Sequence, residues 1–92
     1  MANVIITLKI MPVSTMIDLD KLAALVEKEV HSFTGNGEIK IIQEPIAFGL
    51  KALKVMFLSP EEKGTTDKLE NKIKGIKGVN SVECIDVRRA IG

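Results

Sequence analysis

The side chains that most often carry out chemistry in small proteins are scarce in this sequence. It has one histidine, His31, and one cysteine, Cys84, so it cannot build a four-ligand zinc site or an intramolecular disulfide. His31 has no partner in sequence range that would make it a general base, and a histidine near a helix end suits the helix dipole. Cys84 has no second cysteine and lies in an expected strand, on the side that we expect to be buried, where cysteine acts as a small hydrophobic residue. We therefore predict no catalytic residue, no metal site and no cofactor.

The sequence also lacks the residues for two further functions that small α+β domains can have. Acyl phosphate hydrolysis would need a glycine-rich phosphate loop with an arginine after the first strand, and residues 11–15 contain neither. RNA recognition would need aromatic side chains on which bases stack. Aromatic residues make up 3% of the chain, and Phe33 and Phe57 follow the apolar patterns of a core. The one remaining ring, Phe48, cannot form a stacking platform, so direct nucleic-acid binding is not expected.

Two segments contain residue types that folding does not explain. Residues 45–51 place Phe48 between Ala and Gly in a short connection. Its ring either folds back over a satellite apolar cluster or is an exposed anchor for a protein partner. Arg88 and Arg89 close the last strand. They are either a solvated basic end or a cation held at the tip of a rigid strand.

The apolar positions predict four strands and two helices that would position these segments. In residues 3–11 the apolar residues Val4, Ile6, Leu8 and Ile10 share one parity, which indicates a strand with one buried face. From Leu19 to Phe33 they recur at steps of three and four, which indicates a helix with Asp18 as its N-cap. Three more strands are expected over residues 38–43, 50–58 and 79–88, with a bulge near Ala52. A second helix is expected with a cap at Thr65 or Thr66 and a stop at Gly78.

The order βαββαβ predicts one fold class. Two helices with single apolar stripes cover one face of a four-stranded antiparallel sheet, and right-handed crossovers give the ferredoxin-like α+β arrangement. The length of 92 residues predicts a single domain over residues 1–92. A net charge of +1 is too small for a protein held to nucleic acid by charge. No apolar run approaches the roughly 20 residues of a membrane span, and no signal peptide is recognised, so we expect a cytoplasmic protein without membrane contact.

The two unexplained segments together resemble a known family. Residues 45–53 read Pro-Ile-Ala-Phe-Gly-Leu-Lys-Ala-Leu, which is similar to Pro-Ile-Gly-Phe-Gly-Ile-Lys-Lys-Leu of the translation elongation factor 1-beta family. Residues 79–83, Val-Asn-Ser-Val-Glu, resemble that family's Val-Gln-Ser-x-Asp. The resemblance covers nearly the whole chain, and its details are those of the archaeal form. It implies a guanine nucleotide exchange factor for the GTPase elongation factor 1-alpha, in its GDP- or GTP-bound form.

The resemblance also implies roles for individual residues. In the eukaryotic family the Phe of the Phe-Gly pair docks in a pocket of the partner, and that role would fall on Phe48, with Gly49, Lys51 and Arg88 as further partner-binding residues. A lysine near the eukaryotic C-terminus approaches the magnesium and phosphate site, and the aligned residue here is Arg89. The chain departs from the eukaryotic pattern in this Arg and in having Ser-Thr-Met at residues 14–16 in place of an acidic run.

An exchange factor needs no bond chemistry, so we expect a protein that is not an enzyme and is monomeric when free. It has only to bind the nucleotide-free GTPase better than the loaded one, and by reciprocity nucleotide then binds less well to the complex. A ferredoxin-like small-molecule-sensing module acting as a homodimer is the alternative. An RNA-binding module is a third interpretation, which the missing aromatic residues weaken.

Overall fold

The strand and helix at the start of the chain form as their apolar patterns predict. A computed structural model describes residues 3–34, 38–60 and 67–89. In it β1 (Asn3–Pro12) buries Ile6, Leu8 and Ile10, each at most 3% exposed. Helix α1 (Leu19–Thr34) begins where Asp18 Oδ1 accepts hydrogen bonds from the backbone N–H groups of Asp20 and Lys21, at 3.0 and 3.3 Å. Asp18 is therefore the N-cap, as predicted.

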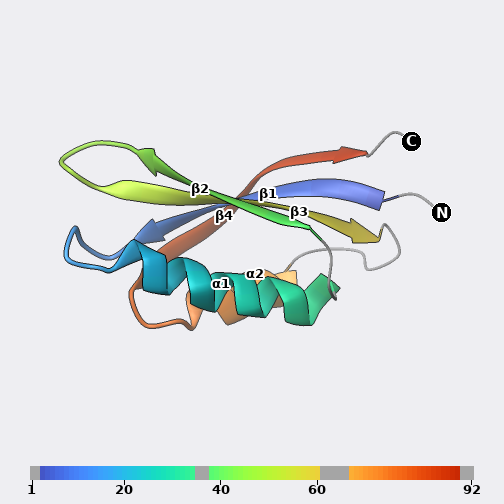
Figure 1. Cartoon of the computed structure of the whole chain (residues 1–92), viewed down its shortest axis with the longest axis horizontal. Helices are drawn as coiled ribbons and strands as arrows, with labels where there is room; N and C mark the ends of the chain where they lie inside the picture. Colours follow the sequence, from blue (N-terminus) through green and yellow to red (C-terminus); the bar gives the residue numbers. More distant parts are fainter. Residues whose placement is uncertain (1–2, 35–37, 61–66, 90–92) are drawn as a thin grey trace.

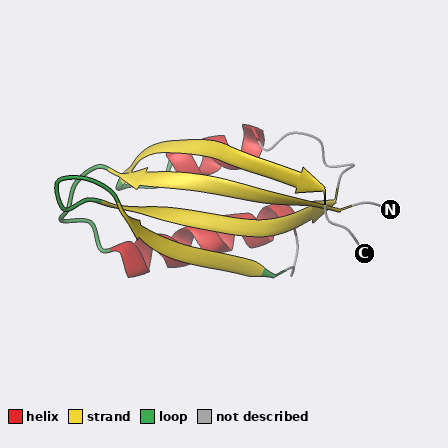
Figure 2. Cartoon of the chain, turned by 90° about the horizontal axis from the view of Figure 1, so that it is seen from above, coloured by secondary structure: helices red, strands yellow, loops and turns green. Residues whose placement is uncertain are grey.

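The remaining elements complete a two-layer α+β fold. They are β2 (Ile39–Pro45), β3 (Lys51–Pro60), α2 (Asp67–Lys74) and β4 (Val79–Arg89). The strands lie in the order β2-β3-β1-β4, and each neighbouring pair is antiparallel. Both helices lie on one face of the sheet, as Figures 1 and 2 show. This arrangement confirms the predicted ferredoxin-like fold. Neither α1 nor α2 is long and apolar enough to cross a membrane.

The core fills the space between the sheet and the two helices. It joins aliphatic side chains of the central strands β1 and β3 to the inner faces of α1 and α2, with one aromatic ring from β3. Its members are Ile6, Leu8, Ile10, Leu22, Val26, Val30, Leu53, Val55, Phe57, Leu69 and Ile73. Within residues 3–34, 38–60 and 67–89, no helix covers the second face of the sheet (Figures 1 and 2).

The bulge predicted near Ala52 is wrong. The pairing of β2 with β3 runs without a break from Pro45 opposite Lys51 to Ile39 opposite Phe57. Leu50, whose parity suggested the bulge, precedes the strand, and its N–H donates to Ala47 O at 3.0 Å across the connecting turn. The parity changes at Leu50 because the residue belongs to a turn.

The irregularities of the sheet lie in β4 instead. Thr7 is opposite Asp86 and the next residue of β1, Leu8, is opposite Cys84, so Ile85 is an extra residue in β4. A second extra residue, Asn80, lies near the start of the strand. At each point two residues of β4 oppose one of β1, which is the pattern of a β-bulge. Because of this extra residue, each side chain after Ile85 faces the side of the sheet opposite to the one that simple alternation from Cys84 predicts.

The second helix ends earlier than predicted. It stops at Lys74, where the Gly75 N–H is shared between the carbonyls of Asn71 and Lys72. Gly78, the predicted stop, lies in the turn before β4 and has a φ of +102°, which favours glycine. The predicted break at residues 35–37, the predicted cap at Thr65 or Thr66 and the closing residues 90–92 lie outside the described residues.

Candidate functional site

Phe48 stands at the tip of the hairpin between β2 and β3, on a turn with an uncommon backbone. Its φ is +56° and that of Gly49 is +77°, so both central residues of the Ala47–Leu50 turn are left-handed, as in a type I′ turn. Hydrogen bonds from Leu50 N–H to Ala47 O (3.0 Å) and from Ile46 N–H to Leu50 O (2.9 Å) close the turn. A left-handed L-residue costs about 1–2 kcal/mol. Asn or Gly is usual here, so an aromatic residue adds strain to the tip.

The ring of Phe48 contributes nothing to the core. The residue is 96% exposed and is absent from the apolar side chains that pack against the buried cluster. The interpretation of a ring folded over a satellite cluster is therefore wrong. Strained residues held by a well-bonded turn are found preferentially at binding sites, and a fully exposed large aromatic ring is a typical interface anchor.

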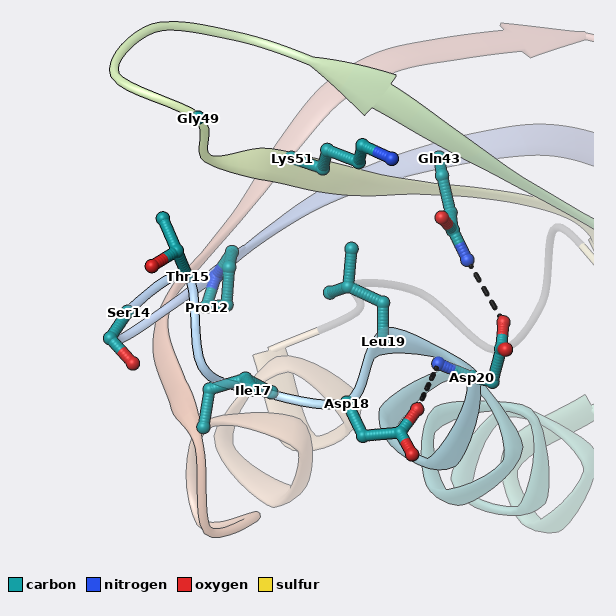
Figure 3. Close-up of a pocket in the computed structure, with 10 residues that line it drawn as sticks. All are labelled: Pro12, Ser14, Thr15, Ile17, Asp18, Leu19, Asp20, Gln43, Gly49 and Lys51. Atoms are coloured by element: carbon teal, nitrogen blue, oxygen red, sulfur yellow. Dashed lines mark hydrogen bonds between the residues drawn. The ribbon is translucent and has the colours of Figure 1, made fainter.

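A polar notch lies behind the hairpin tip, between the hairpin and the start of α1 (Figure 3). Its volume is about 340 Å³, and it is lined by Pro12, Ser14, Thr15, Ile17, Asp18, Leu19, Asp20, Gln43, Gly49 and Lys51. Gln43 Nε2 donates to Asp20 Oδ1 at 3.1 Å, so β2 is tied to the first turn of α1. Sequence reasoning missed this contact, because no local pattern relates residues 23 positions apart. Lys51 is exposed at the foot of the hairpin.

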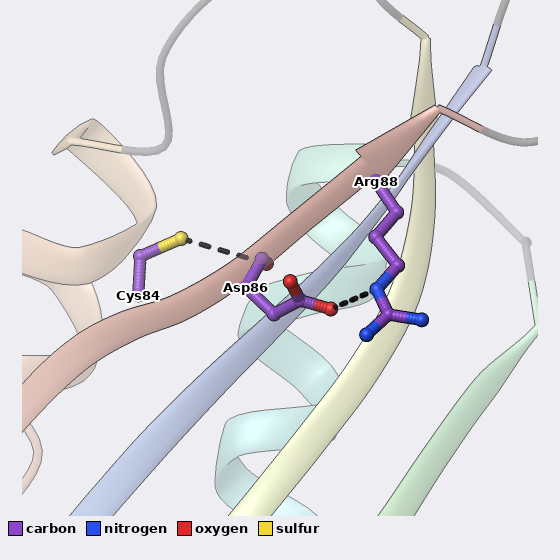
Figure 4. A network of polar contacts seen from close by, with 3 residues as sticks. All are labelled: Cys84, Asp86 and Arg88. Carbon is purple, nitrogen blue, oxygen red and sulfur yellow. Dashed lines mark hydrogen bonds and ion pairs between the residues drawn. The ribbon is translucent and has the colours of Figure 1, made fainter.

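The other candidate residues, Arg88 and Arg89, lie at the end of β4. Arg88 is opposite Ile5, on the open face of the sheet, and Arg89 is opposite Val4, which packs against the core on the helix face. Arg88 Nε contacts Asp86 Oδ2 at 2.8 Å, and the Arg88 side chain is still 76% exposed (Figure 4). Arg88 thus has a fixed acidic neighbour on its own strand, while Arg89 leaves the strand on the opposite face.

The structure separates the two candidate segments. The hairpin tip and the end of β4 lie at opposite ends of a molecule whose longest dimension is 42 Å (Figure 1). Between them run the ten residues of β3, which at about 3.3 Å a residue span roughly 30 Å. Phe48 and Lys51 therefore share one end of the sheet, and Arg88 and Arg89 share the other. No single small pocket could contact both groups.

The two residues considered first for chemistry take structural positions. His31 lies in the last turn of α1. Cys84 is half-buried, its Sγ lies 3.9 Å from the Asp86 carbonyl oxygen, and burial raises the pKa of its thiol, which lowers its reactivity (Figure 4). Within residues 3–34, 38–60 and 67–89, no three His, Cys, Asp or Glu side chains gather in a way that could hold a metal ion.

Comparison with solved structures shows the fold. The de novo designed protein Foldit4 superposes with a TM-score of 0.63 over 98% of both chains, at 19% identity. The ACT domain from the GTP pyrophosphokinase of Chlorobium tepidum gives a TM-score of 0.59, with 15% identity, over 90% of this chain and 99% of its own. At such low sequence identities the structural likeness does not indicate a function, because proteins of this fold have many different functions.

Comparison of the sequence is more specific. The chain is 40% identical over 89 residues to elongation factor 1-beta of Methanothermobacter thermautotrophicus, which covers 97% of this chain and 98% of that protein. Elongation factor 1-beta of Staphylothermus marinus is 42% identical over 91 residues, again covering 97% and 98%. The family model of the EF-1 guanine nucleotide exchange domain matches residues 5–90, a range that holds both the hairpin tip and the two arginines. The chain therefore belongs to the EF-1 guanine nucleotide exchange domain family.

Proposed function

We propose that this protein is a guanine nucleotide exchange factor for elongation factor 1-alpha, and that the whole chain acts as one exchange domain in the cytoplasm. The observation that carries this proposal is Phe48. It is a fully exposed aromatic ring on a strained, hydrogen-bonded turn, in a chain of the exchange-domain family. The ring does not stabilise the fold, so a partner is the physical reason for displaying it.

In this proposal the two ends of the sheet have different tasks. Phe48 provides affinity by entering an apolar pocket of the GTPase, with Gly49 permitting the turn and Lys51 contacting the partner at the foot of the hairpin. Arg89, about 30 Å away along β3, acts at a second region of the same GTPase. A partner that touches both ends must present two separate contact regions, and the sheet between them fixes their spacing.

Arg89 promotes release because it is a cation. Placed near the magnesium and phosphate site, it repels the metal and competes for the metal's anionic ligands. Arg88 lies on the opposite face and is held by Asp86, so it contributes to binding the partner without entering that site. No bond is made or broken in this mechanism, and the protein would not be an enzyme in the chemical sense.

The proposal is tested by measuring release of fluorescent GDP from the cognate elongation factor 1-alpha, with excess unlabelled nucleotide. Catalytic amounts of this protein should accelerate release, and the free protein should sediment as a monomer. The unfolded protein is the control for nonspecific effects. Release at the intrinsic rate, at every concentration of correctly folded protein, would contradict the proposal. A metabolite-dependent homodimer would favour the small-molecule-sensing alternative.

A further inference from the structure

The loop between β1 and α1, residues 13–18, reaches the same end of the molecule as the hairpin tip (Figures 1 and 2). It exposes two large apolar side chains, Val13 at 57% and Met16 at 89%. Single exposed apolar residues are normal on protein surfaces. Here, however, the two most exposed large apolar side chains of the described chain, Phe48 and Met16, lie on neighbouring loops at one end.

The two loops lie close together. Gly49 has no side chain, but a Cβ atom at its position would lie 3.7 Å from Thr15 Cγ2, a distance of ordinary van der Waals contact. Thr15 precedes Met16 in the chain, and Gly49 follows Phe48. Thr15 and Gly49 both line the polar notch (Figure 3). The two loops are therefore near enough for one partner surface to cover both.

Met16 is displayed on a turn that is held at both sides. Val13 N–H donates to Gly78 O at 2.9 Å, and Met16 N–H donates to Ser14 Oγ at 3.2 Å. After Met16, Ile17 packs against the core, so closely over Gly78 that a Cβ there would lie 3.2 Å from Ile17 Cδ1. The loop thus partly buries Ile17 and leaves its neighbour Met16 exposed. A methionine fixed in this way loses little backbone freedom when a partner covers it.

We propose that Met16, together with Val13 of the same loop, is a second anchor of the interface that receives Phe48. Met16 enters an apolar depression on the same GTPase, next to the pocket that receives the Phe48 ring. Residues 14–16 carry no charge, so they cannot make ion pairs, whereas a flexible thioether fills irregular apolar surface well. This inference rests on the proposed function, and it names a partner contact that the hairpin alone does not provide.

The test is the Kd for nucleotide-free elongation factor 1-alpha, measured by calorimetry for the full chain and its variants. Met16→Gln keeps the length of the side chain and removes its apolar character. It should raise Kd about tenfold, which is ~1.4 kcal/mol. Met16→Leu should stay within about twofold of wild type, because the depression accepts another apolar side chain. Since Met16 is so exposed, neither variant should shift the melting temperature of the free protein.

Leu25 supplies the matched control. It is an exposed apolar residue of α1 outside both loops, so Leu25→Gln should bind as wild type does. Wild-type affinity for Met16→Gln, or equal losses for Met16→Gln and Leu25→Gln, would overturn the inference. Provided that the wild type still accelerates GDP release, the proposed function would survive that result. A wild type that neither binds nor accelerates release would overturn both.

Discussion

The two ends of the sheet differ in almost every physical respect. At the hairpin end, an uncharged ring and a thioether are exposed on hydrogen-bonded turns, and neither side chain is buried in the core. The strand end presents two cations on opposite faces of one strand, and Asp86 contacts Arg88. Apolar contacts provide affinity, whereas a charge acts at a distance on a metal and on phosphates. Under the proposed function, this difference predicts that affinity depends on the hairpin end and nucleotide release on the strand end, and that each can be changed without the other.

The largest expected effect is that of Phe48→Ala on affinity. Removing a hot-spot aromatic anchor should weaken binding to elongation factor 1-alpha by about 2–4 kcal/mol, measured as Kd by calorimetry. The free energy of unfolding should change far less, because the ring lies outside the core. An unfolded variant whose remaining folded fraction binds normally would show that Phe48 is structural, and the difference between the ends would then disappear.

Next in size is the effect of Arg89→Ala on release. It should slow GDP release at least tenfold, about 1.4 kcal/mol in activation free energy, while Kd changes much less. The ratio of wild-type to mutant rates should shrink when magnesium is chelated, because two changes acting on the same step are not additive. Stopped-flow fluorescence with and without a chelator measures both ratios.

Arg88→Ala is the matched control for this measurement, since it removes the same charge from the opposite face of the same strand. It should weaken binding modestly, and the ratio of its rate to the wild-type rate should be the same with and without magnesium. A metal-independent ratio for Arg89→Ala would remove the metal mechanism and leave Arg89 as an ordinary interface charge.

A smaller effect on stability distinguishes the role of the Phe48 backbone from that of the Phe48 ring. Phe48→Gly and Phe48→Ala should lose the same affinity, but Gly accepts a φ of +56° without a Cβ clash. The glycine variant should therefore be more stable than the alanine variant by about 0.5–1 kcal/mol in urea unfolding, after its own entropy cost. An alanine variant that is more stable than the glycine variant, by about glycine's entropy cost of 0.5–1 kcal/mol, would mean that the turn is unstrained at residue 48.

The smallest expected effect concerns pH at the open face near the hairpin. Glu44 Oε2 lies 2.7 Å from Lys54 Nζ, and this contact lowers the pKa of the Glu44 carboxyl. The stabilisation it gives is present above the unfolded-state pKa and is lost as pH falls through the lower folded-state pKa. Thermal melts of wild type and Glu44→Gln should differ slightly at neutral pH and converge in acid. High salt should also reduce the difference, since the pair is partly exposed.

Much of the fold could be predicted from the sequence, because an element with one buried face has apolar residues at regular intervals along the chain. The alternation that ends at Ile10 and the three-four steps of α1 each follow from a single buried face. The bulges at Asn80 and Ile85 could not be predicted. An extra residue changes parity without changing composition, and only the pairing with β1 shows where it falls. At Leu50 the same ambiguity produced a bulge that does not exist.

The candidate site was predictable where a residue fitted no pattern. Phe48 attracts attention because a ring between Ala and Gly belongs to no apolar face. Met16 was missed, because an exposed methionine in an uncharged loop looks like any loop residue until its exposure is known. The separation of Phe48 from Arg89 also needed the structure, since the distance between them depends on the strand order and not on spacing in the chain.

The extra residue Ile85 has a consequence for which arginine can act. If residues 85–88 slipped by one position and the bulge closed, Ile85 would come opposite Thr7 and Arg88 would take the place of Arg89 opposite Val4. The same slip would bring Asp86 opposite Ile6, a buried core residue on the face covered by the helices. Because residues two apart lie on the same face of a strand, Asp86 and Arg88 would move together to the helix face and Arg89 would move to the open face. The extra residue Ile85 therefore decides that Arg89, and not Arg88, leaves the strand on the helix face.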